Sequence, residues 1–252
     1  GMGVVWRAKH PHLERNVAVK LIRRDGHLSA DSKANFLSEI KVLSQLHSPQ
    51  VLQVVDAGTL ETGDPYMVTE YLSGEDLASL IKRSRQISPL DACRVGIDIL
   101  KALTEAHALG IVHGDLHPGN IFVLSVPGEA VASVKVLDFG IASLLDAQCK
   151  VEASDGSLPM RGTLNYAAPE QFMGQQGTAA DIYAFGATMY TMLTGEVPFQ
   201  AVGTELLNQK LTKTPKKLSE YDFMSHLEPL DDFVLSCLSR EPAQRPQKAL
   251  AL

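Results

Sequence analysis

Hydrophobic positions in the first third of the chain fall into short runs that are typical of β-strands. Four runs rich in β-branched or aromatic residues occupy positions 4–6, 17–22, 51–55 and 66–69. Between the second and third runs, Phe36, Ile40 and Leu43 recur at a helical spacing. We therefore expect a small sheet that carries a single helix.

From residue 72 onward the pattern changes to longer helical stretches. One helix is predicted to start where Ser88 can cap it and Pro89 takes the first helical position, and to end at Gly110. A second, strongly apolar helix is predicted over 181–193, and short strands at 111–112, 121–124 and 134–137. The sequence therefore predicts an α+β fold with a small β-rich lobe and a larger helical lobe.

Composition and charge narrow the class of protein. The 252 residues are 45% hydrophobic and 21% charged, which excludes a disordered or collagen-like chain. A formal net charge of −6 offers no basic field to a nucleic acid or an anionic membrane, so we expect neither as a partner. The apolar stretch at 182–195 is too short to span a bilayer.

The cysteines and the chain ends bear on the setting of the protein. Cys93, Cys149 and Cys237 lie far apart and lack the spacing of a zinc site or a disulfide framework. They fit a reducing compartment, and we expect a cytoplasmic domain.

The chain opens without a signal peptide and starts and stops in the middle of a pattern. We therefore expect a fragment of a longer protein, whose other parts could include a membrane anchor.

A polar loop between two predicted strands, residues 113–120, carries the first candidate chemistry. Asp115 and Asn120 lie five residues apart there and can face one reaction centre. Asp138 opens an Asp-Phe-Gly tripeptide directly after the next strand. Oxygen ligands from separate loops suit Mg²⁺, which takes phosphate oxygens and waters at its remaining positions. The remaining carboxylate is free to accept a proton from a substrate hydroxyl.

A lysine at the end of an apolar strand adds a positive charge to this set. Lys20 follows Val-Ala-Val, where an ammonium needs an anionic partner. Glu39, on the polar side of the following helix, is the candidate partner. Together these groups indicate phosphoryl transfer, where positioning and charge neutralisation supply most of the catalysis.

These residues stand in the order of a known family. Along its whole length the chain resembles a eukaryotic-type protein serine/threonine kinase, of the sort also found in bacteria. The matching positions are Gly3-Val4-Val5, Val17-Ala18-Val19-Lys20, Glu39, the 113–120 loop, Asp138, Gly162-Thr163, Ala168-Pro169-Glu170, Asp181 and Arg245. The resemblance implies a two-lobed kinase domain over 1–252, with a small antiparallel sheet and one long helix at 1–71 and a mainly helical lobe at 72–252. In this chain, the first strand of the family's fold is truncated at the glycine-rich loop.

The resemblance also implies a role for each catalytic candidate. Asp115 would be the catalytic base. Asn120 and Asp138 would be the Mg²⁺ ligands. Lys20, fixed by Glu39, would hold the α- and β-phosphates of ATP. Thr163 would belong to the end of the activation segment, as in serine/threonine kinases.

A second set of residues would surround the nucleotide. The positions that the resemblance assigns to ATP are Gly3, Val5, Ala18, Lys20, Glu70, Leu72, Asp76 and Phe122. Backbone groups of Glu70 and Leu72 would face adenine, Asp76 would reach the ribose hydroxyls, and the apolar members would sandwich the base. Thr69 occupies the gatekeeper position and is small enough to leave a back pocket open.

One departure from the family bears on regulation. Gly114 stands where most members carry an arginine, whose buried charge a phosphorylated activation segment neutralises. Without that arginine, we expect that phosphorylation of Ser154, Ser157 or Thr163 is not needed to switch the enzyme on.

A second departure lies inside the catalytic loop. His117 replaces the lysine that usually contacts the transferred phosphate. It is either a tolerated polar residue or a phosphate contact that is cationic only when protonated, in which case turnover falls as the pH rises through the histidine range.

The favoured function is Mg²⁺-dependent transfer of the ATP γ-phosphoryl group to serine or threonine hydroxyls of proteins, including the kinase itself by autophosphorylation. The loop His-Gly-Asp-Leu-His-Pro-Gly-Asn also resembles that of aminoglycoside phosphotransferases, so a small-molecule kinase is one alternative. The other is an inactive pseudokinase that binds ATP or acts as a scaffold. The Gly162-Thr163 and Ala168-Pro169-Glu170 positions favour a protein substrate, because small-molecule kinases lack the peptide-docking shelf that they build.

Overall fold

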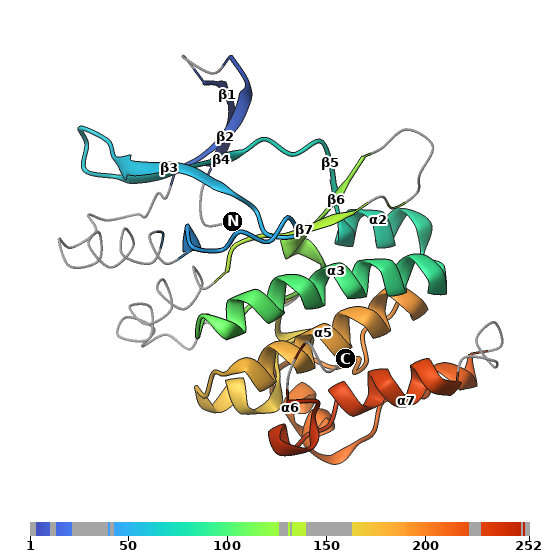
Figure 1. Ribbon diagram of the computed structural model, residues 1–252. Helices are drawn as coiled ribbons and strands as arrows, with labels where there is room; N and C mark the ends of the chain where they lie inside the picture. Colours follow the sequence, from blue (N-terminus) through green and yellow to red (C-terminus); the bar gives the residue numbers. More distant parts are fainter. Residues whose placement is uncertain are drawn as a thin grey trace.

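A four-stranded sheet sits above a stack of helices in the computed structural model, with a smaller sheet between them (Figure 1). The structure describes residues 4–10, 14–21, 40, 43–125, 131, 133–139, 163–221, 228–247 and 249. The helix predicted around Phe36 lies largely outside these ranges.

The upper sheet is antiparallel, in the order β1-β2-β4-β3. Its strands are β1 (Val4–Lys9), β2 (Asn16–Leu21), β3 (Val54–Thr59) and β4 (Pro65–Glu70). Alternate residues of β4 are buried, as expected for a sheet with one face on the core. The predicted strand at 51–55 begins later than expected, at Val54, since Val51 instead forms an isolated bridge to Val136.

A three-stranded antiparallel sheet follows, in the order β5-β6-β7. It consists of β5 (Gly74–Asp76), β6 (Ile121–Leu124) and β7 (Val134–Val136), of which the last two were predicted. The prediction of a strand at 111–112 is wrong. Those residues lead from a helix into the polar loop, and the nearby amides of His113 and Gly114 donate to the carboxylate of Asp181 rather than to a strand.

The α-helices in the described part of the chain are α2 (Leu77–Ser84), α3 (Pro89–Ala108), α5 (Thr178–Thr194), α6 (Gly203–Thr212) and α7 (Glu228–Cys237). Short 3₁₀ helices are η1 (Pro118–Asn120), η2 (Thr163–Asn165), η3 (Pro169–Met173), η4 (Leu218–Glu220) and η6 (Pro242–Gln244). The predicted start of α3 is confirmed: Ser88 Oγ accepts a hydrogen bond from the Asp91 amide, and Pro89 is the first helical residue.

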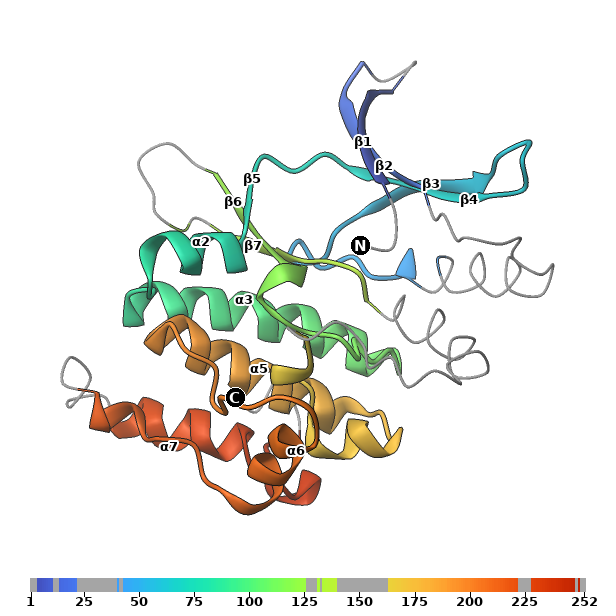
Figure 2. The same cartoon turned by 180° about the vertical axis from the view of Figure 1, so that it is seen from behind.

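Helix α5 forms the centre of the core and lies between α3 and α7 in both ribbon views (Figure 2). Every residue from Ala180 to Leu193 is buried. Close approach to α7 depends on Gly186, where an added Cβ would lie 2.6 Å from the Cβ of Cys237. The apolar run at 182–195 is therefore a core helix, as the sequence predicted.

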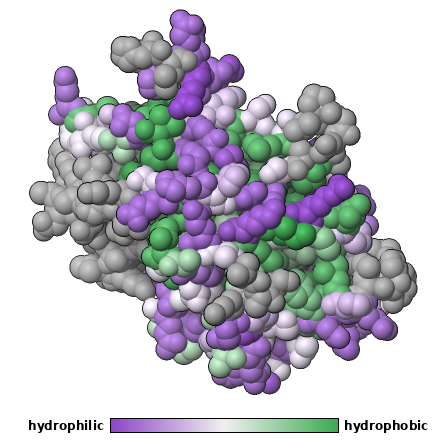
Figure 3. Space-filling model, in the orientation of Figure 1, coloured by the Kyte–Doolittle hydropathy of each residue, from purple (hydrophilic) through white to green (hydrophobic). Residues whose placement is uncertain are grey.

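The surface in the view of Figure 3 mixes hydrophilic and hydrophobic residues, and its apolar patches are interrupted by polar ones. Among the helices that the structure describes, none has the length and apolar character needed to cross a membrane. Cys93 and Cys237 are free thiols.

Candidate active site

Strand pairing brings the polar loop next to the Asp-Phe-Gly segment. Ile121 of β6 pairs with Val136 of β7, so the residues just before β6 lie beside those just after β7. The amide of Leu137 donates to the carbonyl of Asn120 at 2.8 Å. Asn120 and Asp138, eighteen positions apart in the sequence, are held in adjacent chain segments by this bond.

The side chain of Asn120 also organises the loop that carries Asp115. Its Nδ2 donates to the Asp115 carbonyl at 2.9 Å and lies 3.5 Å from Asp115 Oδ2. Because the amide nitrogen is engaged in this way, the amide oxygen is the atom left for another ligand. In the described part of the chain, no three His, Cys, Asp or Glu side chains gather as a metal site of their own.

Lys20 joins the upper sheet to this loop region. Its Nζ lies 2.7 Å from Oδ1 and 2.6 Å from Oδ2 of Asp138. The two side chains are 21% and 31% exposed, so the pair is open enough for a ligand to reach it. The structure thus brings Lys20, Asp115, Asn120 and Asp138 to one place. Glu39, the predicted partner of Lys20, lies outside the described residues.

His113 holds the two loops together. Its Nε2 donates to the Leu137 carbonyl at 2.9 Å, its Nδ1 accepts from the Asp115 amide at 3.3 Å, and its ring lies 4.7 Å from that of Phe139. These bonds fit a neutral ring protonated at Nε2. Burial lowers the pKa of His113 below 6.5, against the opposing effect of the Asp181 carboxylate.

Acid should therefore destabilise the fold through His113. The unfolded chain takes up a proton near the ordinary histidine pKa, whereas the buried ring resists it, so stability falls as the pH drops below about 6.5. We expect a lower free energy of unfolding at about pH 5.5 than at about pH 7.5 in urea titrations. In His113→Asn this loss should shrink. His47→Asn changes an exposed histidine and serves as the control, which should lose as much stability in acid as the parent. If the loss in His47→Asn were as small as in His113→Asn, the assignment to His113 would be wrong.

Asp181, in the first turn of α5, anchors the loop backbone to the core. Its carboxylate accepts from the amides of His113 and Gly114 at 2.8 and 2.9 Å, and His107 Nε2 lies 2.8 Å from Oδ2. Asp181 is buried, and these partners with the helix N-terminus compensate its charge. Gly114 has φ +76°, a left-handed conformation that glycine adopts without strain.

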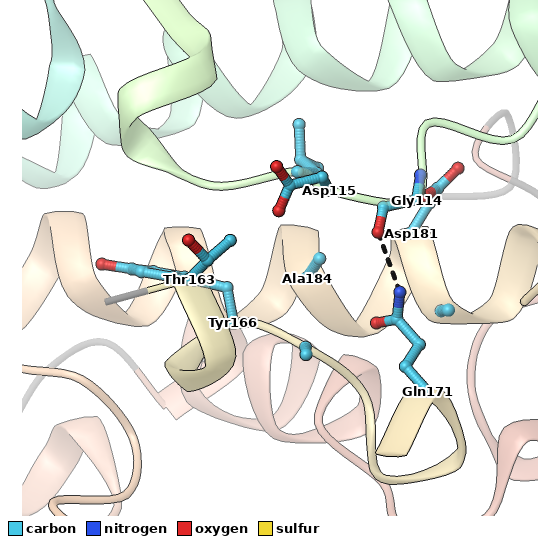
Figure 4. Close-up of a pocket in the computed structure, with 10 residues that line it drawn as sticks. Gly114, Asp115, Thr163, Tyr166, Gln171, Asp181 and Ala184 are labelled. Carbon is cyan, nitrogen blue, oxygen red and sulfur yellow. Dashed lines mark hydrogen bonds between the residues drawn. The ribbon is translucent and has the colours of Figure 1, made fainter. Parts of the chain in front are cut away.

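A small cavity lies between Asp115 and the segment that begins at Thr163 (Figure 4). Thr163, Tyr166 and Ala167 line its far side. Gln171 also lines it and donates from Nε2 to the Gly114 carbonyl at 2.8 Å, drawn as the dashed line in Figure 4. The cavity therefore separates the predicted base from the predicted end of the activation segment.

The segment after this cavity is fixed by a buried ion pair. Arg245 Nη1 and Nη2 donate to the two carboxylate oxygens of Glu170 at 2.6 and 2.8 Å. The Arg245 side chain is fully buried, and it also donates to the carbonyls of Ala179, Ser239 and Arg240. Such a two-pronged pair fixes the direction of both side chains.

Comparison with known proteins identifies the fold. The chain matches the protein kinase domain over residues 1–252. It belongs to the protein kinase family. Two curated relatives are serine/threonine-protein kinase pkn3 of Myxococcus xanthus, 34% identical over 256 residues, and serine/threonine-protein kinase PknF of Mycobacterium tuberculosis, 31% identical over 255 residues. The matches cover 100% and 99% of this chain, but 46% and 52% of those proteins.

A solved structure supports the same assignment. The crystal structure of Rad53 1-466 in complex with AMP-PNP superimposes with a TM-score of 0.78 at 25% identity, covering 99% of this chain and 60% of that one. The predicted two-lobed α+β kinase fold is therefore confirmed, and the kinase domain described here spans about half the length of its two curated relatives.

The hinge of this kinase domain begins where β4 ends. Glu70 Oε1 accepts from the Gln53 amide at 2.9 Å and lies 2.7 Å from Nζ of Lys135 on β7. These contacts tie the last residue of the upper sheet to the lower sheet. Leu72, also predicted to face adenine, follows in the connection between the sheets and is itself half-buried.

The other predicted nucleotide contacts occupy the two sheets. Ala18 lies on β2 opposite Thr69, and Val5 lies on β1 opposite Lys20. Phe122 lies on β6 opposite Asp76. Asp76 is the N-cap of α2, and its carboxylate accepts from the amide and hydroxyl of Ser79, each at 2.8 Å, so it has a structural role that the sequence did not predict.

Thr69 is buried and lines a second small cavity of about 20 Å³. Leu46, Val136, Asp138 and Phe139 line the same space. A space of this size holds a single water.

His117 faces the predicted base. Its Nε2 lies 3.7 Å from Asp115 Oδ2, while Nδ1 accepts from the Gly119 amide at 3.0 Å. Since Nδ1 is an acceptor, the neutral ring carries its proton on Nε2, toward Asp115. The ring also lies 6.2 Å from that of Tyr166.

Some predicted positions lie outside the described residues, and some residues that make contacts in the structure were not predicted from the sequence. Gly3, Glu39, Ser154, Ser157 and Gly162 belong to the first group. Gln171 and Lys135 belong to the second. Gln171 directly follows Ala-Pro-Glu, a signal that could have marked it, whereas nothing local marks Lys135 as a partner of the hinge.

Proposed function

We propose that this kinase domain transfers the γ-phosphoryl group of ATP to serine or threonine hydroxyls of proteins, with Mg²⁺ as cofactor. The observation that carries the proposal is the meeting of Lys20, Asp115, Asn120 and Asp138. The names of the relatives pkn3 and PknF support a serine/threonine substrate, and the AMP-PNP complex of Rad53 supports ATP as the donor.

Lys20 supplies the positive charge for the nucleotide. Its ammonium binds the carboxylate of Asp138, and phosphate oxygens are anionic acceptors of the same kind. When ATP is bound, Lys20 would hold the α- and β-phosphates, and Glu39 is predicted to fix its position. Gly3, Val5, Ala18, Phe122 and the backbone of Glu70 and Leu72 would hold the rest of the nucleotide.

The donor set of Asn120 and Asp138 fits Mg²⁺. Asn120 has its amide oxygen left for a ligand, and Asp138 supplies carboxylate oxygens from a separate chain segment. When bound, Mg²⁺ neutralises negative charge on the reacting phosphates. Asn120 at the same time keeps Asp115 in place through its amide nitrogen.

Asp115 would act as the base. Its carboxylate takes the proton of the substrate hydroxyl while that oxygen bonds to the γ-phosphorus and the bond to the bridging oxygen of ADP breaks. His117, with Nε2 toward Asp115, is placed to contact the transferred phosphate when protonated.

A protein substrate fits better than a small molecule. Thr163, Tyr166 and Ala167 form a wall across the cavity from Asp115, which a peptide can follow. Gly114 contributes no buried positive charge, so we propose that phosphorylation of Ser154, Ser157 or Thr163 is not needed for activity. The free thiols Cys93 and Cys237 support action in the cytoplasm.

Transfer of radiolabelled phosphate from ATP tests the proposal. With Mg²⁺, the parent protein should label casein and itself, and Asp115→Ala should label neither. Kanamycin, run in parallel, should stay unlabelled. Nucleotide binding without transfer to any acceptor would instead identify a pseudokinase, and labelling of kanamycin alone would identify a small-molecule kinase.

A further inference from the structure

A lysine is buried on α6, on the side of the helix that faces the wall of the cavity. Lys210 is only 2% exposed, although lysine is almost never fully buried without partners. Its Nζ donates to the carbonyl of Asn165 at 2.9 Å and to that of Ala167 at 2.5 Å. The side chain thus bridges more than forty positions of sequence to reach two backbone carbonyls.

Aromatic rings and charged groups surround Lys210. Its Nζ lies 5.0 Å from the ring centroid of Tyr183 and 5.8 Å from that of Phe172. Burial and the nearby Arg245 lower the pKa of Lys210 to about 7, and Glu170 opposes them. Both the ammonium and the neutral amine keep at least two N–H groups, so either form can serve the two carbonyls.

The two carbonyls belong to the wall that faces Asp115. Asn165 and Ala167 flank Tyr166, and Tyr166 and Ala167 line the cavity together with Asp115. The position of this wall relative to the base is therefore coupled to the position of the Lys210 side chain. In the described part of the chain, the two hydrogen bonds of Lys210 Nζ go to this wall and not to the 113–120 loop or to Lys20.

We propose that Lys210 is a positioning residue for the protein substrate, holding the 165–167 backbone where a peptide docks beside Asp115. This proposal rests on the proposed function. Removing the donor leaves two carbonyls without their partner in a poorly hydrated place. The backbone then turns toward water, which displaces the docking wall and leaves the nucleotide contacts unchanged.

Steady-state kinetics of Lys210→Met test the role. Methionine keeps the length and the packing of the stem but has no N–H donor. We expect KM for a peptide substrate to rise about tenfold. KM for ATP and the slow hydrolysis of ATP without peptide should stay within about twofold of the parent. Lys213→Met, the same change at an exposed position at the end of α6, should alter none of these constants.

A second variant separates positioning from bulk stability. Lys210→Arg keeps the N–H donors and should recover most of the affinity for peptide. An unchanged peptide KM in folded Lys210→Met would overturn the proposal. So would a Met variant that fails to fold or loses ATP hydrolysis in parallel, because either result assigns Lys210 a purely structural role. If the parent protein labels no protein substrate, the proposed function fails. If the parent labels protein but Lys210→Met leaves the peptide KM unchanged, only the role of Lys210 fails.

Discussion

Phosphoryl transfer should fall by roughly a thousandfold or more in Asp138→Asn. The substitution removes the negative charge that Lys20 contacts at 2.6 Å and weakens Asp138 as the proposed oxygen ligand of Mg²⁺. Lys20 is 21% exposed, so its ammonium can be hydrated and the fold should persist. The measurement is the initial rate of radiolabel transfer from ATP at saturating Mg²⁺, with circular dichroism as the check on folding.

Asparagine is the right replacement because of the backbone. Asp138 has φ +53°, and asparagine tolerates this left-handed conformation better than alanine does. Asp56→Asn, the same change at an exposed position on β3, serves as the matched control and should keep the parent rate. Transfer by Asp138→Asn within tenfold of the parent would remove Asp138 from the mechanism.

Arg245→Met should cost roughly 3–5 kcal/mol of unfolding free energy. The fully buried guanidinium makes two bonds to the carboxylate of Glu170, which is itself only 10% exposed. Without Arg245 that carboxylate is left buried and unpaired. Urea unfolding followed by tryptophan or far-ultraviolet signals gives the number.

Two further variants decide whether pairing is the cause. The double change Glu170→Met with Arg245→Met should recover much of the loss, because apolar replacement of both partners removes the unpaired charge. Arg83→Met breaks the ion pair with Glu75 on the surface, where Arg83 is 65% exposed, and should cost less than about 1 kcal/mol. A double variant as unstable as Arg245→Met alone would refute the explanation.

Local patterns were enough for the elements whose boundaries are set by local chemistry. The Ser88 cap and the following proline start α3 as predicted, and the apolar run that became α5 is buried along its length. The strand expected at 111–112 failed because a carboxylate far away in the sequence captures the neighbouring amides. That long-range choice leaves no trace in the local pattern.

The candidate site divides in the same way. Asp115, Asn120 and Asp138 were found because short motifs carry them, and Lys20 because a charge follows an apolar strand. Lys210 was missed although it lies four positions after Leu206, on the buried side of α6. In a sequence, a lysine near the end of a helix is normally expected to extend its ammonium into solvent. Only the carbonyls of Asn165 and Ala167, over forty residues away, explain its burial.

The amides of His113 and Gly114, which donate to Asp181, tie the stability of the 113–120 loop to that of the core. Their acceptor stands in the first turn of α5, a helix that is buried from Ala180 to Leu193, and this protects both hydrogens from exchange with solvent. Lys20, by contrast, is borne by a thin sheet near the top of the molecule. Warming or mild denaturant should thus release Lys20, the residue proposed to bind the nucleotide, before it disturbs Asp115, the proposed base.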